Sequence, residues 1–258
     1  MIQLACEQEM NFQDIMMQVM AEEYMYLREN GEELVTESLS GLKDKFKQST
    51  VNVIKKAGQF FSTVSHKLSD TVNADQAFVK KYGTGLRNAT YDTTKVDPDY
   101  HTSFYDLANF IKNDMVQVES GCNKIGALAS QSSPDISKIK NEIFDARDTM
   151  ESFYKNQIEK DTKVTVSVKE CIAILNNKDE QVNTIKRAYT NIVKMCKSQL
   201  SKYNSVTDQA LVLVGKYYTW AQSFSIRVYN LLVKELNKFR VFAKKLILKA
   251  YNEEHKAS

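Results

Sequence analysis

The fold of this chain is decided by residues 210–250, ALVLVGKYYTWAQSFSIRVYNLLVKELNKFRVFAKKLILKA. Apolar residues follow one another there at alternating steps of four and three, first as Ala210, Val214, Tyr217, Ala221, Phe224, Val228 and Leu231, and after a shift of one residue as Leu232, Leu236, Phe239, Ala243, Leu246 and Ala250. Such spacing lines one side of an α-helix with apolar side chains. The shift turns the apolar stripe around the helix axis, as expected where a helix changes its packing partner midway. The stretch therefore predicts a single long helix.

The same stepping of apolar residues fills three further segments, residues 104–129, 136–153 and 168–200. A turn separates the first two segments, and Ser133 is the expected N-cap, with Pro134 at the first helical position. The β-branched run TKVTVSV at 162–168 is expected to lead into the next helix, with a short extended piece as the alternative. Only two prolines and eight glycines interrupt the 258 residues. The sequence thus predicts an all-α fold, an elongated bundle of long antiparallel helices without a sheet of three or more strands.

Residues 1–37 form an acidic leader that is distinct in charge from the rest of the chain. They carry nine acidic residues against one base, Arg28, so their net charge is −8. The whole chain has a net charge of +3, which leaves +11 on residues 38–258. A short acidic helix is expected at about 10–29, closed by Asn30-Gly31. An acidic leader on a basic body suggests that the body meets a polyanion and that the leader masks or steers it.

A basic amphipathic helix is expected in residues 38–81, where eight lysines stand against three acids. A second basic segment, residues 216–258, has nine bases against three acids. The candidate polyanion-binding residues are Lys43, Lys45, Lys47, Lys55, Lys56, Lys67, Lys238, Arg240, Lys244, Lys245 and Lys249. A solvated bundle face is the alternative interpretation. Because lysines outnumber arginines, contact with nucleic acid would be to phosphates, non-specific and salt-sensitive, and an anionic membrane surface is the competing partner.

Residues 82–103 break the helical pattern. They are rich in Gly, Thr, Asn and Asp, hold Pro98 and show no sustained period. We expect a linker or long surface loop there, because a loop of such length is unusual inside a compact domain. The expected units are the leader 1–37, which is a candidate propeptide, the basic helix 38–81, the linker 82–103 and the helical body 104–258.

No catalytic signature is present, so no enzyme activity, catalytic residue or cofactor is predicted. The nearest approach to a metal site is Asp97, Asp99 and His101, which we interpret as turn formers. The four cysteines stand far apart in the sequence and are predicted to be buried free thiols, with two disulfides as the alternative. No run of about 18 apolar residues occurs, so no membrane span is predicted.

Residues 20–72, MAEEYMYLRENGEELVTESLSGLKDKFKQSTVNVIKKAGQFFSTVSHKLSDTV, resemble the start of internal virion proteins of large tailed bacteriophages. In that group a short acidic leader precedes a lysine-rich amphipathic helix and a long helical body. A maturation protease removes the leader after a glutamate that follows a small or aliphatic residue and any one residue. The matching positions here are Val35, Thr36 and Glu37, with Ser38 after the cut. Val35 departs from the family, which more often has Leu, Ile, Ser or Ala at that position.

The resemblance implies a structural, non-enzymatic virion protein that is made in the host cytoplasm and packaged inside the phage head. Its implied partners are capsid or other virion proteins and the packaged DNA, bound without sequence specificity, and self-association is a further candidate. Removal of the leader at maturation would release the basic body to sit against DNA or the inner capsid. The alternative function is a membrane-acting protein in which residues 38–72 insert and the acidic leader silences them.

Overall fold

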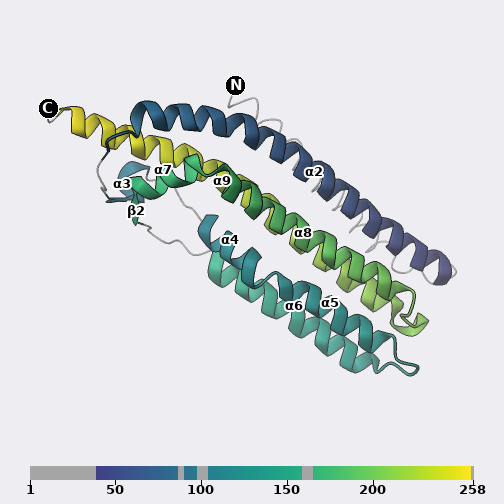
Figure 1. Cartoon of the computed structure of the whole chain (residues 1–258). Helices are drawn as coiled ribbons and strands as arrows, with labels where there is room; N and C mark the ends of the chain where they lie inside the picture. Colours follow the sequence, from purple (N-terminus) through teal and green to yellow (C-terminus); the bar gives the residue numbers. More distant parts are fainter. Residues whose placement is uncertain (1–38, 87–89, 98–103, 159–164, 257–258) are drawn as a thin grey trace.

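The computed structural model describes residues 39–86, 90–97, 104–158 and 165–256 of the chain. Its helices are α2 (Leu39–Tyr82), α3 (Thr93–Val96), α4 (Phe104–Asn113), α5 (Val116–Ala129), α6 (Ile136–Ile158), α7 (Val168–Asn176), α8 (Lys178–Tyr203) and α9 (Asp208–Lys256), and its strands are β1 (Thr90–Asp92) and β2 (Thr165–Ser167). The long helices lie side by side along one common direction and form an elongated bundle (Figure 1). The prediction of an all-α fold is confirmed. The acidic helix expected at 10–29 and the junction Val35–Ser38 lie outside the described residues.

The central element of the bundle is α9, which contacts each of the helices from α2 to α8. Adjacent residues of α9 are buried together, as in the pairs Tyr217-Tyr218 and Leu246-Ile247, so α9 is covered on more than one side. Near its start Tyr218 donates a hydrogen bond to the Cys122 carbonyl of α5, whereas near its end Phe239 stacks on Phe104 of α4. The packing partner of α9 therefore changes along its length, as the one-residue shift in the apolar stripe predicted.

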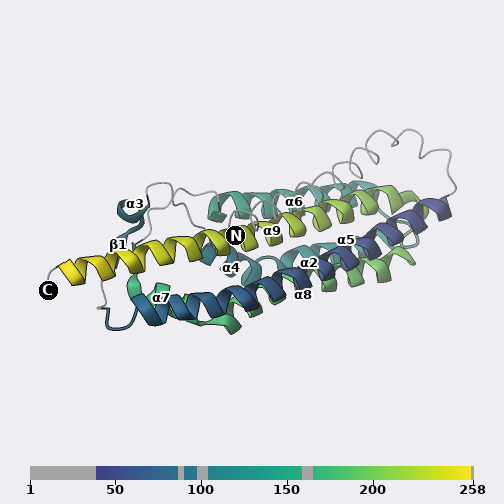
Figure 2. The ribbon, with the colours of Figure 1, turned by 90° about the horizontal axis from the view of Figure 1, so that it is seen from above.

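The successive long segments of the chain, which are α2, α4 with α5, α6, α7 with α8, and α9, alternate in direction (Figures 1 and 2). Helix α6 runs parallel to its neighbour α9, since Arg147 lies over Trp220 and Tyr154 lies beside Arg227, and α2 also runs parallel to α9. Contacts between α2 and α9 advance in the same direction, from Thr50 against Gln222 to Tyr82 against Tyr251. Buried residues of α2 and of α4 to α9 belong to a single hydrophobic core, which joins the basic helix to the helical body.

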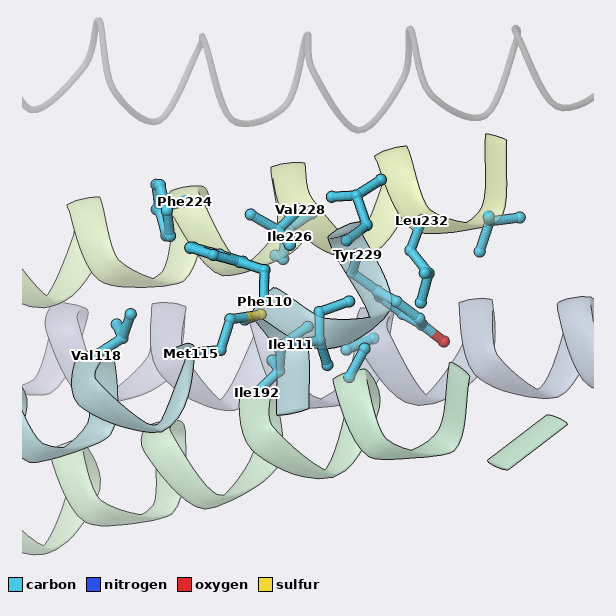
Figure 3. Close-up of a cluster of buried hydrophobic side chains, with 14 of the residues drawn as sticks. Phe110, Ile111, Met115, Val118, Ile192, Phe224, Ile226, Val228, Tyr229 and Leu232 are labelled. Carbon is cyan, nitrogen blue, oxygen red and sulfur yellow. The ribbon is translucent and has the colours of Figure 1, made fainter. Parts of the chain in front are cut away.

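The helix predicted over 104–129 is interrupted between α4 and α5. The Met115 amide donates to the Phe110 carbonyl at 3.0 Å, one residue further back than in a regular α-helix. This leaves the Ile111 carbonyl free to accept from Nδ2 of Asn191 on α8 at 3.0 Å. The interruption lies in the core, where Phe110, Ile111 and Met115 lie beside residues of α9 (Figure 3). Pairing with a side chain of α8 thus replaces a regular bond within the helix.

The helix predicted over 168–200 is also two helices, because Asn177 ends α7 and caps α8. Its Oδ1 accepts from the Glu180 amide at 3.0 Å. Ser167 and Glu170 form a capping box at the start of α7. At α6 the prediction of Ser133 as N-cap is wrong, since the helix begins at Ile136 and Oδ1 of Asp135 accepts from the Lys138 amide at 2.9 Å.

Residues 90–96 differ from the linker expected over 82–103. Strand β1 pairs antiparallel with β2, with Tyr91 opposite Val166, and α3 follows at once. The short extended alternative is therefore the one found for Thr165–Ser167, and residues 162–164 of the same run lie outside the described residues. Val166 is buried beside α7 and supplies the hydrophobic contact that an isolated two-stranded ribbon lacks.

A layer of hydrogen-bonded polar side chains crosses the apolar core and links α2, α5, α8 and α9. Nε2 of Gln222 lies 2.9 Å from Oγ1 of Thr50 and 2.6 Å from Oε1 of Gln199, to both of which it can donate. Nε2 of Gln199 in turn lies 3.3 Å from Sγ of Cys122. All four residues are buried. Sliding one helix along another would leave these groups unpaired, so the layer favours a single axial register.

Close helix packing at Gly215 generates a stability prediction. A Cβ atom at Gly215 of α9 would overlap three ring carbons of Phe46, which is itself stacked on Tyr203. We expect Gly215→Ala to lower the free energy of unfolding by roughly 1–3 kcal/mol, measured by chemical denaturation. Gly58→Ala is the matched control, because its Cβ would lie an ordinary 3.5 Å from the Tyr189 hydroxyl and alanine favours a helix. Equal destabilisation by both changes would contradict this packing.

Burial of the thiols generates a second prediction. Cys122, Cys171 and Cys196 are free and buried, as predicted, and Cys6 lies outside the described residues. Burial raises the pKa of each of the three thiols to about 12. In a Cys6→Ser background at pH 8 we therefore expect no reaction with a thiol-reactive disulfide reagent until denaturant is added, when three thiols react. Rapid labelling of the native protein would show that the core is open.

Candidate polyanion-binding surface

The predicted basic residues of α9 include two that are committed to a buried carboxylate. Asp75 of α2 is completely buried, and Nε of Arg240 donates to its Oδ2 at 2.8 Å. Lys244 forms an ion pair with the other carboxylate oxygen, Oδ1. A buried carboxylate requires such compensation, since its transfer out of water is costly. Arg240 is only 4% exposed, so its guanidinium is not accessible to a polyanion.

The remaining predicted residues of α9 also have partners within the molecule. Lys245 forms an ion pair with Asp97, and Lys238 forms one with Glu235 at 2.8 Å. Nζ of Lys249 donates to the Lys95 carbonyl at 3.2 Å and lies over the ring of Tyr91. Lys245 and Lys249 therefore attach β1 and α3 to the end of α9. Of the group Asp97, Asp99 and His101, only Asp97 lies within the described residues.

The predicted lysines of α2 do not form one cluster. Lys45, Lys56 and Lys67 are spaced by eleven residues, about three helical turns, so they share one line along the helix. Lys47 lies on a different line, eleven residues before Gly58, which faces Tyr189 of α8. Nζ of Lys43, one turn earlier, donates to the Val206 carbonyl just beyond α8 at 3.4 Å. Lys55 is exposed between these two lines.

The basic side chains that sequence reasoning missed lie on α8. From Gln181 to Tyr203 this helix carries five bases and no acid, and Lys186, Arg187, Lys194 and Lys197 are all exposed. The charge totals of the leader and of the two basic segments do not include residues 178–203, whose apolar stepping alone marks them as a helix. Counting charge separately for each expected helix would have found this segment.

Charge is distributed unequally across the bundle. Helices α2 and α8 lie side by side (Figures 1 and 2) and carry eight bases against three acids and six against two, for a combined +9. Helices α4, α5 and α6 together carry six bases and six acids. We call this outward part of the α2 and α8 surface the α2–α8 basic face, and define it by the half-buried Lys47 and the exposed Lys55, Lys186, Lys194 and Lys197.

Other kinds of site find less support in the described residues. No group of three or more His, Cys, Asp or Glu side chains there is placed to hold a metal ion. None of the helices in these ranges is both long and apolar enough to cross a membrane. A groove between α4 and the joint of α7 and α8 includes Asn109, Lys112, Asn177 and Arg187 in its lining, a set of mixed polar groups.

The buried ion cluster generates a third prediction. Asp75→Asn leaves the buried Arg240 guanidinium without a counter-charge, and we expect it to lower the free energy of unfolding by roughly 3–5 kcal/mol. Lys245→Gln removes one partner of the Lys245–Asp97 pair, whose lysine side chain is 53% exposed, and should cost less than about 1 kcal/mol. Chemical denaturation of both variants tests this difference. Equal, small losses would show that the Asp75 pair does not stabilise the α2–α9 contact.

Comparison of the chain with known protein families, with curated proteins and with solved structures finds no match.

Proposed function

We propose that this chain is a structural, non-enzymatic protein of a tailed-phage virion, packaged inside the head and in contact with DNA or the inner capsid. The unequal charge of the bundle is the observation that carries the proposal. A rod with one basic side and one electrically neutral side is suited to lie against packaged DNA on the first and against protein on the second. The likeness of residues 20–72 to internal virion proteins supports the location inside the head.

Binding to DNA is proposed to be non-specific. Four of the five bases that α8 carries beyond its first turn are lysines, and all the bases of α2 are lysines. A lysine ammonium group is a compact point charge that pairs with phosphate, whereas reading of base edges relies chiefly on planar, bidentate side chains. Affinity then comes from phosphate contacts and from release of counterions, and it is insensitive to sequence.

The acidic leader is proposed to regulate this binding. Residues 1–37 carry −8 and residues 38–258 carry +11, so the leader opposes most of the attraction between the body and DNA. Scission between Glu37 and Ser38 during maturation would remove that opposition. Because α2 begins at Leu39, the cut would fall just before the helix and would leave its whole length intact.

The membrane-acting alternative is less well supported by the packing of α2. Its apolar stripe, which includes Leu42, Phe46, Phe60 and Leu68, is buried in the core of the bundle. Insertion of this stripe into a bilayer would require α2 to leave α8 and α9 and to expose their apolar surfaces. Electrostatic adsorption of the folded bundle onto anionic headgroups requires no such change, so vesicles belong in the test.

Full-length protein and residues 38–258 are to be titrated with random-sequence duplex DNA and with vesicles of phosphatidylserine and phosphatidylcholine over a series of salt concentrations. We expect DNA affinity to fall by more than about tenfold between 50 and 200 mM salt, because several phosphate contacts are screened. Residues 38–258 should bind DNA more tightly at every salt concentration and melt at a similar temperature. Affinity retained at several hundred millimolar salt, strong sequence preference, or vesicle leakage without DNA binding would count against the proposal.

A further inference from the structure

We infer that the polyanion site is a track along the outer seam between α2 and α8, which takes one sugar-phosphate backbone of duplex DNA, and that the basic end of α9 takes no part. This inference rests on the proposed function and names the site and the mode of contact. It differs from the sequence-based candidates, because two of the five track residues lie on α2 and three on α8. The track residues are those of the α2–α8 basic face.

Stacked aromatic rings set the register between the two helices. The ring centroids of Phe46 and Tyr203 are 5.9 Å apart, and those of Phe61 and Tyr189 are 5.0 Å apart. The residue number rises along α2 while that of its partner falls along α8, so the two helices are antiparallel. A residue of α2 and a residue of α8 lie at the same height along the bundle when their numbers add up to about 249 or 250. By this register Lys55 of α2 lies level with the stretch of α8 between Lys194 and Lys197.

Helical periodicity places Lys186 and Lys197 of α8 on the outer side of the seam, while Lys194, one turn before Ser198, lies at the edge of the exposed face that is nearer α5. Lys186 and Lys197 are eleven residues apart and share one line, which runs beside Tyr189 on the α2 side of α8. The other side of α8 faces α4 and α5, where Asn191 bonds to the Ile111 carbonyl and Ser198 bonds to Asn123. Because both lysines are exposed, their line borders the solvent edge of the seam and not its core edge.

The length of the track matches a short run of phosphates. From the level of Lys47 to that of Lys186 is about 17 residues, which is about 25 Å along the bundle. One DNA strand has about seven phosphates over that distance along its axis, so five lysines give about two ammonium groups for every three phosphates. Asp44 near one end, and Asp179 and Glu180 near the other, are exposed acids that limit the track to this length.

The ammonium groups of the track are not neutralised by any acid in the part of the chain that the structure describes. Among the residues that the structure describes, no carboxylate forms an ion pair with any of the five track lysines, whereas Lys238, Lys244 and Lys245 of α9 each have one. Ser62 and Ser201 are small exposed side chains along the same stretch, and the larger exposed ones there include Gln48, Gln59 and Arg187, which are uncharged or basic. Unpaired charge favours the seam over the end of α9 as the phosphate-binding site.

The test compares two triple variants of the full-length chain that remove the same charge. The seam variant is Lys55→Gln, Lys194→Gln and Lys197→Gln, and the matched control on α9 is Lys238→Gln, Lys245→Gln and Lys249→Gln. Affinity for a random-sequence 20-base-pair duplex is measured over a salt series, with thermal melting of each variant.

We expect the seam variant to reduce the slope of log affinity against log salt by about 2.7, and to bind at least tenfold more weakly at low salt. The α9 variant should stay within about twofold of the wild type. Arginine at the three seam positions should restore both quantities, because the seam needs charge and not the lysine side chain itself.

Each other outcome overturns the inference in a distinct way. Equal weakening by both triple variants would show that net charge, and no particular track, governs binding, while the proposed function would stand. Greater weakening by the α9 variant would move the site to α9. Loss of binding to phosphatidylserine vesicles by the seam variant, with DNA binding unchanged, would assign the seam to a membrane surface. No DNA binding by the wild type at low salt would overturn the proposed function as well.

Discussion

The bundle depends on the burial of α9. This helix has 49 residues, about 74 Å of length, and carries apolar side chains on more than one of its sides. Left in water, residues such as Tyr218, Leu232, Phe242 and Leu246 would expose a large apolar area, so other helices must enclose α9 along its whole length. The parallel placement of α2 and the change of partner from α5 to α4 follow from this requirement, because no single neighbour covers both ends and all sides.

Polar groups within the core determine how the enclosing helices align. The Gln222 amide connects Thr50 of α2 to Gln199 of α8, and Asp75 binds Arg240 at the far end of the same α2–α9 contact. Hydrophobic packing alone tolerates small axial slips, whereas each of these bonds is lost by a slip of one turn. The ion cluster also changes the electrostatics of the surface, since it withdraws Arg240 and Lys244 into the structure and leaves α8 as the second carrier of accessible charge.

The proposed function uses this division between internal and external charge. The bases that hold α9 to α2, α3 and β1 stabilise the fold, while the lysines of the α2–α8 basic face have no acidic partner among the described residues. A helical rod whose core fixes the spacing of external lysines presents charge at defined intervals along its length. Such an arrangement suits a linear polyanion, and the α4–α6 side, with balanced charge, is left for contact with protein.

The sequence by itself determined the all-α class, the presence of long helices at α6 and α9, and the burial of three cysteines, because regular apolar spacing reports directly on which helix side meets a core. Local sequence did not determine the breaks at Asn177 and Met115. At the break near Met115, the Ile111 carbonyl accepts a hydrogen bond from Asn191, which belongs to another helix. Only the tertiary structure decided the candidate site. The sequence lists charges without their partners, and whether a base binds a polyanion or a buried carboxylate depends on residues as distant as Asp75 and Arg240. That pairing, and the antiparallel register that brings Lys55 level with Lys194, exist only once the helices have packed.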